Sequence, residues 1–382
     1  MEEQPRSLLK ARTILAQALG AGDPITGALI PPVHMSSTFL RDPDNGYSAG
    51  FVYGRTDNAT VRQVERVLAT LEGAADTMMF SSGMAAATAV FLALEKPTHI
   101  IASHVIYWGF REWLDNVGMY GGHVVSFVDT SDLDAVAAAI RPGETGIFWI
   151  ETPSNPLWTI TDIAAIAEIA HAAGALLCVD STVSTPIITR PIAFGADLVV
   201  HSATKYLNGH SDVIAGAIAV AADSPHWQGI QKVRGQLGAI VGPFEAWLLL
   251  RGMRTLDVRL REQSKSAAKL AGMLVGHAAV SNVLYPGLAT HPGHATAERQ
   301  MGGLYGGMLS IRMRGGEAAA IAAASRVRVW KRATSFGGVE SLIEHRASIE
   351  GEGTPCPHDL LRLSTGLEDI DDLFEDLMQA LG

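Results

Sequence analysis

The sequence has few cysteines, a shortage of basic residues and no long apolar run. Only Cys178 and Cys356 are cysteines, which excludes a disulfide framework and a cysteine-based metal site. The 39 acidic residues outnumber the 29 basic ones, and the net charge of −10 argues against nucleic acid or an anionic membrane surface as partner. No apolar stretch approaches the ~18 residues of a membrane span, and the start MEEQPRSLLK lacks the apolar segment of a signal peptide. We therefore expect a soluble cytoplasmic protein.

The chain is too long for one hydrophobic core and divides by pattern into three parts. Single cores stop growing at roughly 250–300 residues, whereas this chain has 382 residues, 48% of them apolar. Residues 145–180 read as an apolar strand, a helix and a second apolar strand, which predicts a parallel βαβ unit. Later in the chain, residues 242–274 are expected to form one long helix. We predict an arm over residues 1–54, a large α/β domain over 55–245 and a smaller C-terminal domain over 246–382.

Two neighbouring predicted strands end in charged residues. Asp180 ends the apolar run ALLCVD, and Lys205 lies just beyond the run DLVV. Ligands of open α/β sheets bind beyond the carboxyl ends of the strands, so both charges are expected at one edge of the sheet. A salt bridge is the plainer interpretation, because a buried lysine almost always has a partner. The pair alone leaves both interpretations open.

A third strand end suits an anion. In MMFSSGMAA, residues 81–84 lie between a predicted strand and a predicted helix, where free N–H groups and the helix dipole favour phosphate. An ordinary serine N-cap explains the same letters. Upstream, FVYGRTDNAT offers Tyr53 and Arg55 as donors to phosphate, although alone this stretch reads as a surface loop.

Together, the three strand ends predict a pyridoxal phosphate site. The lysine would form a Schiff base with the aldehyde of the cofactor, and the acid would keep its pyridine nitrogen protonated. The helix start would hold the phosphate. Tyr107, in SHVIYWGF, could stack on the ring or could simply be an aromatic residue at a strand end.

Ordered motifs along almost the whole chain carry a family resemblance. They include DPITGALIPPVHMSSTF, YGRTDNAT, FSSGMAA, ETPSNP, VDST, HSATKYLNGHSD, RGMRTLDVRL, HPGHATAERQMGG, SFGGVESLIEH and RLSTGLEDIDDL. Through them the sequence resembles the Cys/Met-metabolism family of pyridoxal phosphate enzymes, which includes cystathionine γ-synthase, cystathionine lyases, methionine γ-lyase and O-acylhomoserine sulfhydrylases. The resemblance implies fold type I, an aspartate-aminotransferase-like α/β fold with a mostly parallel central sheet and a smaller α+β C-terminal domain. It also implies a homotetramer built from two active dimers, in which the N-terminal arm contacts a neighbouring subunit.

The resemblance also implies roles for individual residues. Lys205 is similar to the Schiff-base lysine that shuttles protons, Asp180 to the partner of the pyridinium nitrogen and Tyr107 to the ring-stacking tyrosine, which makes these three the catalytic set. Tyr53 and Arg55 match a pair that reaches the phosphate of the neighbouring subunit. The other matches are Ser82, Gly83, Met84, Ser202 and Thr204 around the phosphate, Asn155 and Arg362 at the substrate carboxylate, Ser341 near the lysine amine, and Glu340 near the distal end of the substrate.

The implied reaction is γ-elimination or γ-replacement on an L-amino acid with a homoserine frame. Departures from the family pattern bear on the substrate. Val52 stands where members that handle cystathionine tend to carry an acid, and Gly109 stands where methionine γ-lyases carry a cysteine. These differences count against cystathionine and methionine as preferred substrates.

Aromatic and acidic residues beside Tyr107 suggest a cationic substrate. Trp108 and Phe110, with Glu112 or Glu340, would suit a planar guanidinium such as that of canavanine, or they could merely pack a helix start. The candidate substrates are therefore canavanine, methionine and O-acylhomoserines. The alternative function is that of a cystathionine γ-synthase or a cystathionine lyase.

Two other classes of function fit the sequence less well. Ser202 and Lys205 form an S-x-x-K pattern, but a serine acyl hydrolase of that type also needs K-T-G, which the chain lacks. His291 and His294 have no evident third ligand, so no metal site is predicted. A non-catalytic binding protein on the same fold is the remaining alternative, and an intact set of lysine, acid and arginine argues against it.

Overall fold

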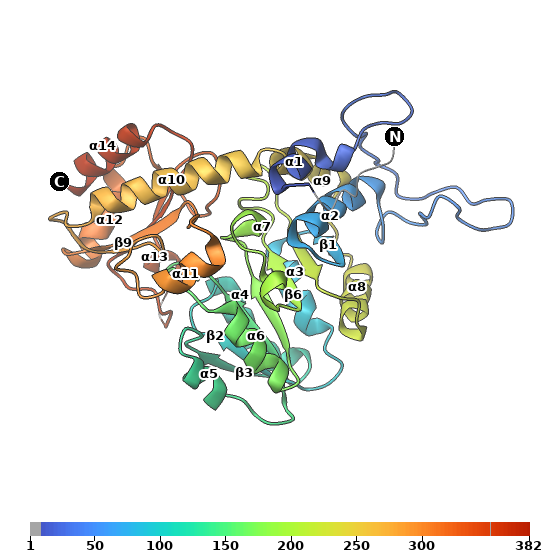
Figure 1. The fold of residues 1–382 in the computed structure, drawn as a ribbon, viewed down its shortest axis with the longest axis horizontal. Helices are drawn as coiled ribbons and strands as arrows, with labels where there is room; N and C mark the ends of the chain where they lie inside the picture. The colour runs from blue at the N-terminus through green and yellow to red at the C-terminus, as the bar shows by residue number, and fades with distance from the viewer. Residues whose placement is uncertain (1–8, 352) are drawn as a thin grey trace.

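Two β-sheets organise the computed structural model, which describes residues 9–351 and 353–382. The seven-stranded sheet lies in the lower half of Figure 1, and the five-stranded sheet lies at the upper left, beneath the ends of α10, α12 and α14. α10 (Leu256–Leu274) runs along the top from one half of the molecule to the other. The two sheets fall on either side of the predicted boundary at residue 245, which itself stays a prediction.

The seven-stranded sheet has the order β1-β7-β6-β5-β4-β2-β3 and is parallel except for β7, which runs antiparallel to both of its neighbours. Its strands alternate between two apolar cores: Ile147 and Trp149 face one side, whereas Phe148 and Ile150 face the other. Burial on both faces explains why these strands appear in the sequence as continuous apolar runs. The strands are β1 (Asp76–Phe80), β2 (His99–Ser103), β3 (Val124–Val128), β4 (Thr145–Glu151), β5 (Leu176–Asp180), β6 (Leu198–His201) and β7 (Gly216–Val220).

The five-stranded sheet has the order β10-β11-β12-β9-β8 and is antiparallel except for the pairing of β10 with β11. One face packs against α10, α12 and α14 through a separate apolar core. This arrangement agrees with the smaller α+β unit implied by the resemblance. Its strands are β8 (Val280–Leu284), β9 (Met308–Met313), β10 (Lys331–Arg332), β11 (Leu342–His345) and β12 (Leu360–Ser364).

The predicted βαβ unit of residues 145–180 is confirmed. β4 and β5 pair in parallel, and α6 connects them. Asp162 caps α6 by accepting a hydrogen bond from the Ala165 N–H at 3.2 Å. The remaining helices are α1 (Ala11–Gln17), α2 (Ala59–Glu72), α3 (Gly83–Leu92), α4 (Trp108–Asp115), α5 (Leu133–Ala138), α6 (Ile163–Ala172), α7 (Thr185–Ile188), α8 (Pro225–Leu237), α9 (Pro243–Met253), α11 (His294–Met301), α12 (Gly316–Arg326), α13 (Ala347–Glu350) and α14 (Ile370–Leu381).

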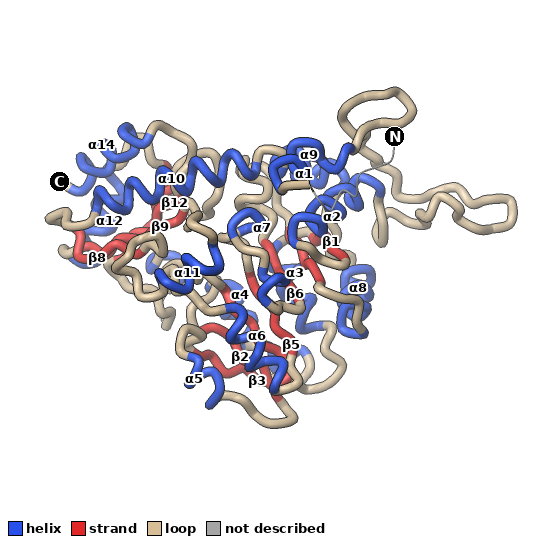
Figure 2. Tube along the Cα trace, viewed as in Figure 1, coloured by secondary structure: helices blue, strands red, loops and turns tan. Residues whose placement is uncertain are grey.

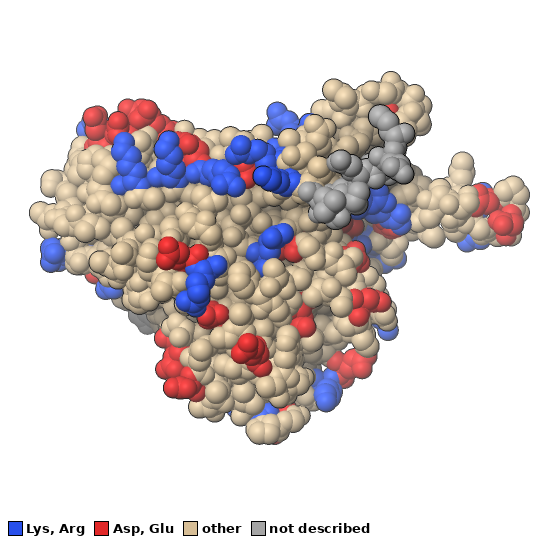
Figure 3. Space-filling view, in the orientation of Figure 1, with Lys and Arg blue, Asp and Glu red and all other residues tan. Residues whose placement is uncertain are grey.

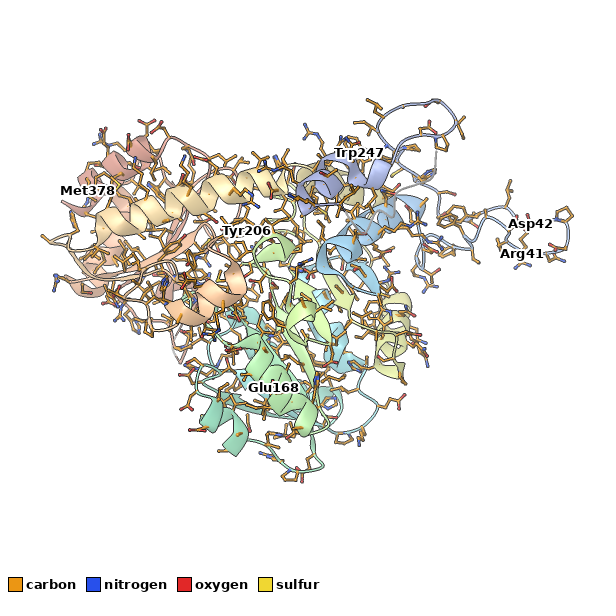
Figure 4. The ribbon with its side chains drawn as sticks, in the orientation of Figure 1. Arg41, Asp42, Glu168, Tyr206, Trp247 and Met378 are labelled. Carbon is orange, nitrogen blue, oxygen red and sulfur yellow. The ribbon has the colours of Figure 1, made fainter. Side chains whose placement is uncertain are left out.

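The single helix expected over residues 242–274 is wrong, because the segment forms two helices, α9 and α10. The chain turns between them, where the Thr255 hydroxyl donates to the Gly252 carbonyl at 3.0 Å. In the first turn of α10, the Arg259 guanidinium donates to the carbonyls of Gly252 and Tyr206, both at 3.0 Å. The break therefore lets Arg259 support the segment that follows β6. Figure 4 shows Tyr206, in that segment, between the two halves of the molecule.

The N-terminal part of the chain projects from the rest. Figure 1 shows its loops extending to the right, and Figure 4 places Arg41 and Asp42 at their far tip. Several large apolar side chains are exposed there, including Ile25 at 92%, Leu29 at 88% and Leu40 at 96%. Of the predicted arm, residues 1–8 lie outside the described residues. Among the helices of the described residues, none combines the length and the hydropathy of a membrane span.

Candidate active site

A cavity of about 250 Å³ lies at the carboxyl ends of the central strands. It brings together the strand-end residues that the sequence singled out. The lining comprises Ser82, Gly83, Met84, Ala87, Tyr107, Phe110, Glu151, Asn155, Asp180, Thr182, Val183, Val200, Ser202, Thr204, Lys205, Ile214 and Phe336. Nine predicted site residues thus line one cavity: Ser82, Gly83, Met84, Tyr107, Asn155, Asp180, Ser202, Thr204 and Lys205.

Lys205 presents its amine to this cavity. Its Nζ donates to the Ser335 hydroxyl at 2.7 Å. Burial lowers the pKa of Lys205 to about 8, and the positive charge of Arg362 adds to the effect. An amine with this pKa is partly neutral near physiological pH, which is the state that can attack a carbonyl or accept a proton.

Ser341, expected near the lysine amine, does not contact it. The Ser341 hydroxyl instead donates to Glu368 Oε2 at 2.7 Å, and its N–H donates to the other oxygen of that carboxylate, also at 2.7 Å. The serine beside the amine is Ser335, in the turn between β10 and β11. Its φ of +92° is rare for a residue with a side chain, and such strain is common at functional sites. The sequence interpretation placed this serine six residues too late in the segment ATSFGGVESLIEH.

Asp180 and Glu151 end two adjacent parallel strands and lie opposite one another in the register. Burial raises the pKa of Asp180, although its carboxylate accepts a hydrogen bond from the Thr182 N–H at 2.9 Å. Burial, together with the charge of Asp180, raises the pKa of Glu151 to about 8. A cationic group bound at this edge would keep Asp180 ionised.

The start of α3 forms the third side of the cavity. Ser82 is an N-cap, since its hydroxyl accepts from the Ala85 N–H at 3.0 Å. The first-turn N–H groups that the cap leaves free have no intrahelical acceptor. A Cβ added at Gly83 would lie 2.7 Å from the Cβ of Ser202, so only glycine allows this close approach. The turn can therefore cap α3 through Ser82 and still offer free N–H groups to an anion.

These three sides fit pyridoxal phosphate. Lys205 offers an amine for the aldehyde, Asp180 an acid for the pyridine nitrogen, and the helix start offers N–H donors for the phosphate. Tyr53 and Arg55 lie outside this cavity. Tyr53 is 47% exposed, and the Arg55 guanidinium donates to the carbonyl of Gly235.

Arg362 and Asn155 meet although 207 residues separate them. Arg362 Nη1 donates to Asn155 Oδ1 at 3.0 Å, while Nη2 donates to the Ser335 carbonyl at 2.8 Å and to Glu344 Oε2 at 2.6 Å. Burial lowers the pKa of Arg362 to about 10, and the guanidinium stays charged at neutral pH. Sequence reasoning missed Glu344, whose only signal was its place in the motif SLIEH.

The residues expected to bind a cationic substrate do not come together at the cavity. Phe110 is a core residue that packs on Trp149 with ring centroids 4.4 Å apart, although it touches the lining. Glu112 lies on the exposed side of α4. Glu340 accepts a hydrogen bond from the Ser211 hydroxyl and is absent from the cavity lining.

The histidine pair 291/294 makes backbone contacts. His294 Nδ1 bonds to the Pro286 carbonyl at 2.8 Å, and His291 Nδ1 accepts from the Gly293 N–H at 3.1 Å. Within residues 9–351 and 353–382, no group of three or more His, Cys, Asp or Glu side chains is arranged to hold a metal ion.

A family model of Cys/Met metabolism PLP-dependent enzymes matches residues 12–382. The chain belongs to this family. Similar relatives include the cystathionine γ-synthase of Mycobacterium tuberculosis, which is 45% identical over 375 residues with 96% of each chain covered. The cystathionine γ-lyase of Bacillus subtilis is 39% identical, with 98% of this chain and 99% of the relative covered.

A solved structure agrees with these relatives. The cystathionine γ-synthase of Xanthomonas oryzae, in complex with cystathionine, has a TM-score of 0.92 and 40% identity, with 98% of each chain covered. The protein is therefore a fold-type I, pyridoxal-phosphate-dependent enzyme of the trans-sulfuration type that acts at Cγ of amino acids. The fold, the family and the cofactor expected from the sequence are confirmed.

Proposed function

We propose that this enzyme is a cystathionine γ-synthase, which joins cysteine to an O-acylhomoserine. In this replacement the Cγ–O bond breaks, the acyl group leaves as a carboxylate, and the thiol sulfur of cysteine bonds to Cγ as the thiol proton is released. The similarity to the mycobacterial γ-synthase, higher than that to the bacillar γ-lyase, supports this direction. Cystathionine γ-lyase is the second candidate, because the same residues can cleave the Cγ–S bond of cystathionine.

One observation carries the chemistry, namely the Lys205 amine held 2.7 Å from Ser335 beside Arg362. When bound, pyridoxal phosphate supplies an electron-accepting ring. Lys205, neutral above pH about 8, would move the protons between Cα and Cβ. Arg362 and Asn155 would hold the substrate carboxylate, and Ser335 would orient both the amine and the guanidinium.

The remaining cofactor contacts belong to the same proposal. Asp180 would pair with the pyridine nitrogen and Tyr107 would lie on the ring. The phosphate would bind at residues 82–84, with Ser202 and Thr204 beside it. Because Tyr53 and Arg55 lie outside their own cavity, they would serve the phosphate of a neighbouring subunit. The exposed apolar residues of the arm support a dimer, and the family resemblance a tetramer of two such dimers.

Canavanine is less well supported as the substrate than the substrates of a cystathionine enzyme. Val52 counts against cystathionine and Gly109 against methionine, yet the two relatives named above, which match almost the whole chain, are cystathionine enzymes. The guanidinium hypothesis also needs Glu112 or Glu340 at the cavity, as the acid that pairs with the cation. Glu112 and Glu340 are both absent from the lining.

A single panel of assays tests the proposal. The purified enzyme would receive O-succinylhomoserine or O-acetylhomoserine with cysteine, the same esters without cysteine, and cystathionine, methionine or canavanine alone. A γ-synthase forms cystathionine from an ester with cysteine at a kcat/KM at least about tenfold above any cleavage reaction, a margin of about 1.4 kcal/mol. If cleavage of cystathionine is faster, the γ-lyase is correct, and if canavanine leads the panel, both are wrong.

A further inference from the structure

Glu151 ends β4 in the cavity wall and is buried, with 6% of its surface exposed. Its two carboxylate oxygens have different partners. Oε2 accepts from the Tyr107 N–H at 2.8 Å, and Oε1 accepts from the Asn155 N–H at 2.7 Å. One side chain thus holds the backbone of two residues that belong to different parts of the site.

We propose that Glu151 is a positioning residue, which sets the separation between the ring-facing Tyr107 and the Asn155–Arg362 pair that takes the substrate carboxylate. The cofactor and the substrate lie between these groups in the proposed function, on which this inference rests. Glu151 itself would touch neither reacting atoms nor the substrate.

A continuous series of hydrogen bonds crosses the molecule. Tyr107 is bonded to Glu151, Glu151 to Asn155, and Asn155 to Arg362 at 3.0 Å. Arg362 is fixed in turn by Glu344, on β11 of the five-stranded sheet. Glu151 therefore connects the loop after β2 to a guanidinium of the other sheet.

A carboxylate is suited to this task. Burial and the charge of Asp180 raise the pKa of Glu151 to about 8, so the side chain is ionised above that pH. Each oxygen then accepts from an N–H without a competing donor, and hydrogen bonds to a charged acceptor are shorter and stronger than neutral ones. Tyr107 lies at the junction of a loop and the start of α4, where a small rotation of the backbone would move its ring. Because misplaced groups lose rate even when the chemistry is intact, the anchor is expected to matter for function.

The test compares Glu151→Gln with Glu144→Gln. Glu144 lies just before the other end of the same strand and is exposed, so the pair of variants makes the same chemical change at opposite ends of β4. In Glu151→Gln, an amide NH₂ must face a backbone N–H. Above pH about 8, where Glu151 is ionised, loss of a charged hydrogen bond is expected to raise KM for the amino-acid substrate about tenfold or more. The Kd of the apoprotein for pyridoxal phosphate should rise in the same variant, and Glu144→Gln should leave both constants unchanged.

The Asn155→Ala background separates positioning from general stability. Asn155→Ala keeps the backbone N–H but removes the side chain that Glu151 positions. Glu151→Gln should therefore raise KM by less than about twofold in that background, because effects that act through one group are not additive. Full additivity, or a lowered Tm with unchanged KM and unchanged cofactor affinity, would overturn the proposal.

Two further measurements keep the outcome clear. If Glu151→Gln does not fold, Glu151→Asp retains the charge but is too short to reach both N–H groups, and a KM between those of the wild type and Asn155→Ala is expected. An unchanged KM in Glu151→Asp would contradict the anchor. If the wild type converts none of the proposed substrates, the proposed function fails, while cofactor affinity of the apoprotein variants still decides whether Glu151 positions Tyr107.

Discussion

The strand-end cavity and the N-terminal arm differ in how their side chains are exposed and paired. In the cavity, the charged groups are buried or half-buried and hydrogen-bonded to partners of the same chain, as in the contacts of Lys205 with Ser335 and of Arg362 with Asn155. In the arm, Leu40 is 96% exposed and Ile25 92% exposed. The cavity is therefore organised within one chain, whereas the arm presents apolar surface that suits a protein partner.

The charged surface differs from both regions. Figure 3 shows a row of basic side chains along the top of the molecule, over α10, and an acidic group at α14. Lys269 and Asp371 join the two helices by an ion pair of 2.7 Å, and both side chains are about half or more exposed. Such an exposed pair contributes little to stability, unlike the buried contacts of the cavity.

Removal of the cavity's amine should give the largest effect. Lys205→Ala deletes the group proposed to bind the cofactor and move protons, and kcat is expected to fall by about 10³-fold or more. The exposed Lys265→Ala is the matched control and should keep wild-type kcat. Borohydride reduction and peptide mapping of the wild type should find the cofactor on Lys205. A label on another lysine would contradict the assignment of Lys205 as the amine that binds the cofactor.

Neutralising the acid beside the amine should give the next effect. Asp180→Asn keeps the shape but removes the charge proposed to hold the pyridine nitrogen protonated, and kcat should fall about a hundredfold. Asp129, just beyond β3 at the same edge of the sheet, is exposed and outside the 250 Å³ cavity, so Asp129→Asn is the control. Equal kcat values for the two variants would mean that Asp180 is only structural.

The local part of this site could be predicted from the sequence. Asp180, Lys205 and residues 82–84 each lie at or shortly after the end of an apolar strand, and parallel strands bring such residues to one edge. Asn155 and Arg362, by contrast, were identified through the family resemblance alone, because no local pattern joins residues 207 positions apart.

Long-range packing accounts for the errors. Ser335 reaches Lys205 through a turn with φ of +92°, which the sequence pattern does not reveal, so the prediction of Ser341 beside the amine is wrong. The break between α9 and α10 has a similar cause. Both helices keep the 3.6-residue period, and the turn between them is accompanied by a long-range contact of Arg259 with the carbonyl of Tyr206. Glu151 lies within the motif ETPSNP, but its two backbone partners are evident only from the fold.

Mixed dimers would test whether the arm completes a neighbour's site. Arg55→Ala and Lys205→Ala chains should each be inactive alone. A dimer with one chain of each kind would have one site with both defects and one site with neither. Random reassociation of equal amounts should therefore recover about a quarter of wild-type activity. If mass spectrometry shows mixed dimers and no activity returns, Arg55 serves its own chain.

The smallest effect concerns the titration of the cavity amine. Burial and the charge of Arg362 lower the pKa of Lys205 to about 8, whereas an ordinary lysine has a pKa of about 10.4. The neutral amine is the form that captures an aldehyde, so the rate of pyridoxal phosphate uptake by the apoprotein should rise up to tenfold per pH unit below pH about 8 and level off above it. N-α-acetyl-lysine, measured in the same buffers, should keep rising to about pH 10.4.

The same shift has a consequence for the stability of the apoprotein. Between pH about 8 and about 10.4 the unfolded chain binds the proton of Lys205 and the folded chain does not, so the free energy of unfolding should rise with pH in that window. Lys205→Met, which cannot titrate, should lack this increment in urea unfolding. If the rate of uptake instead follows the profile of N-α-acetyl-lysine, or if wild type and Lys205→Met show the same pH dependence of stability, the cavity does not lower the pKa of Lys205. A lowered pKa of Lys205 would then no longer distinguish the cavity from the exposed arm.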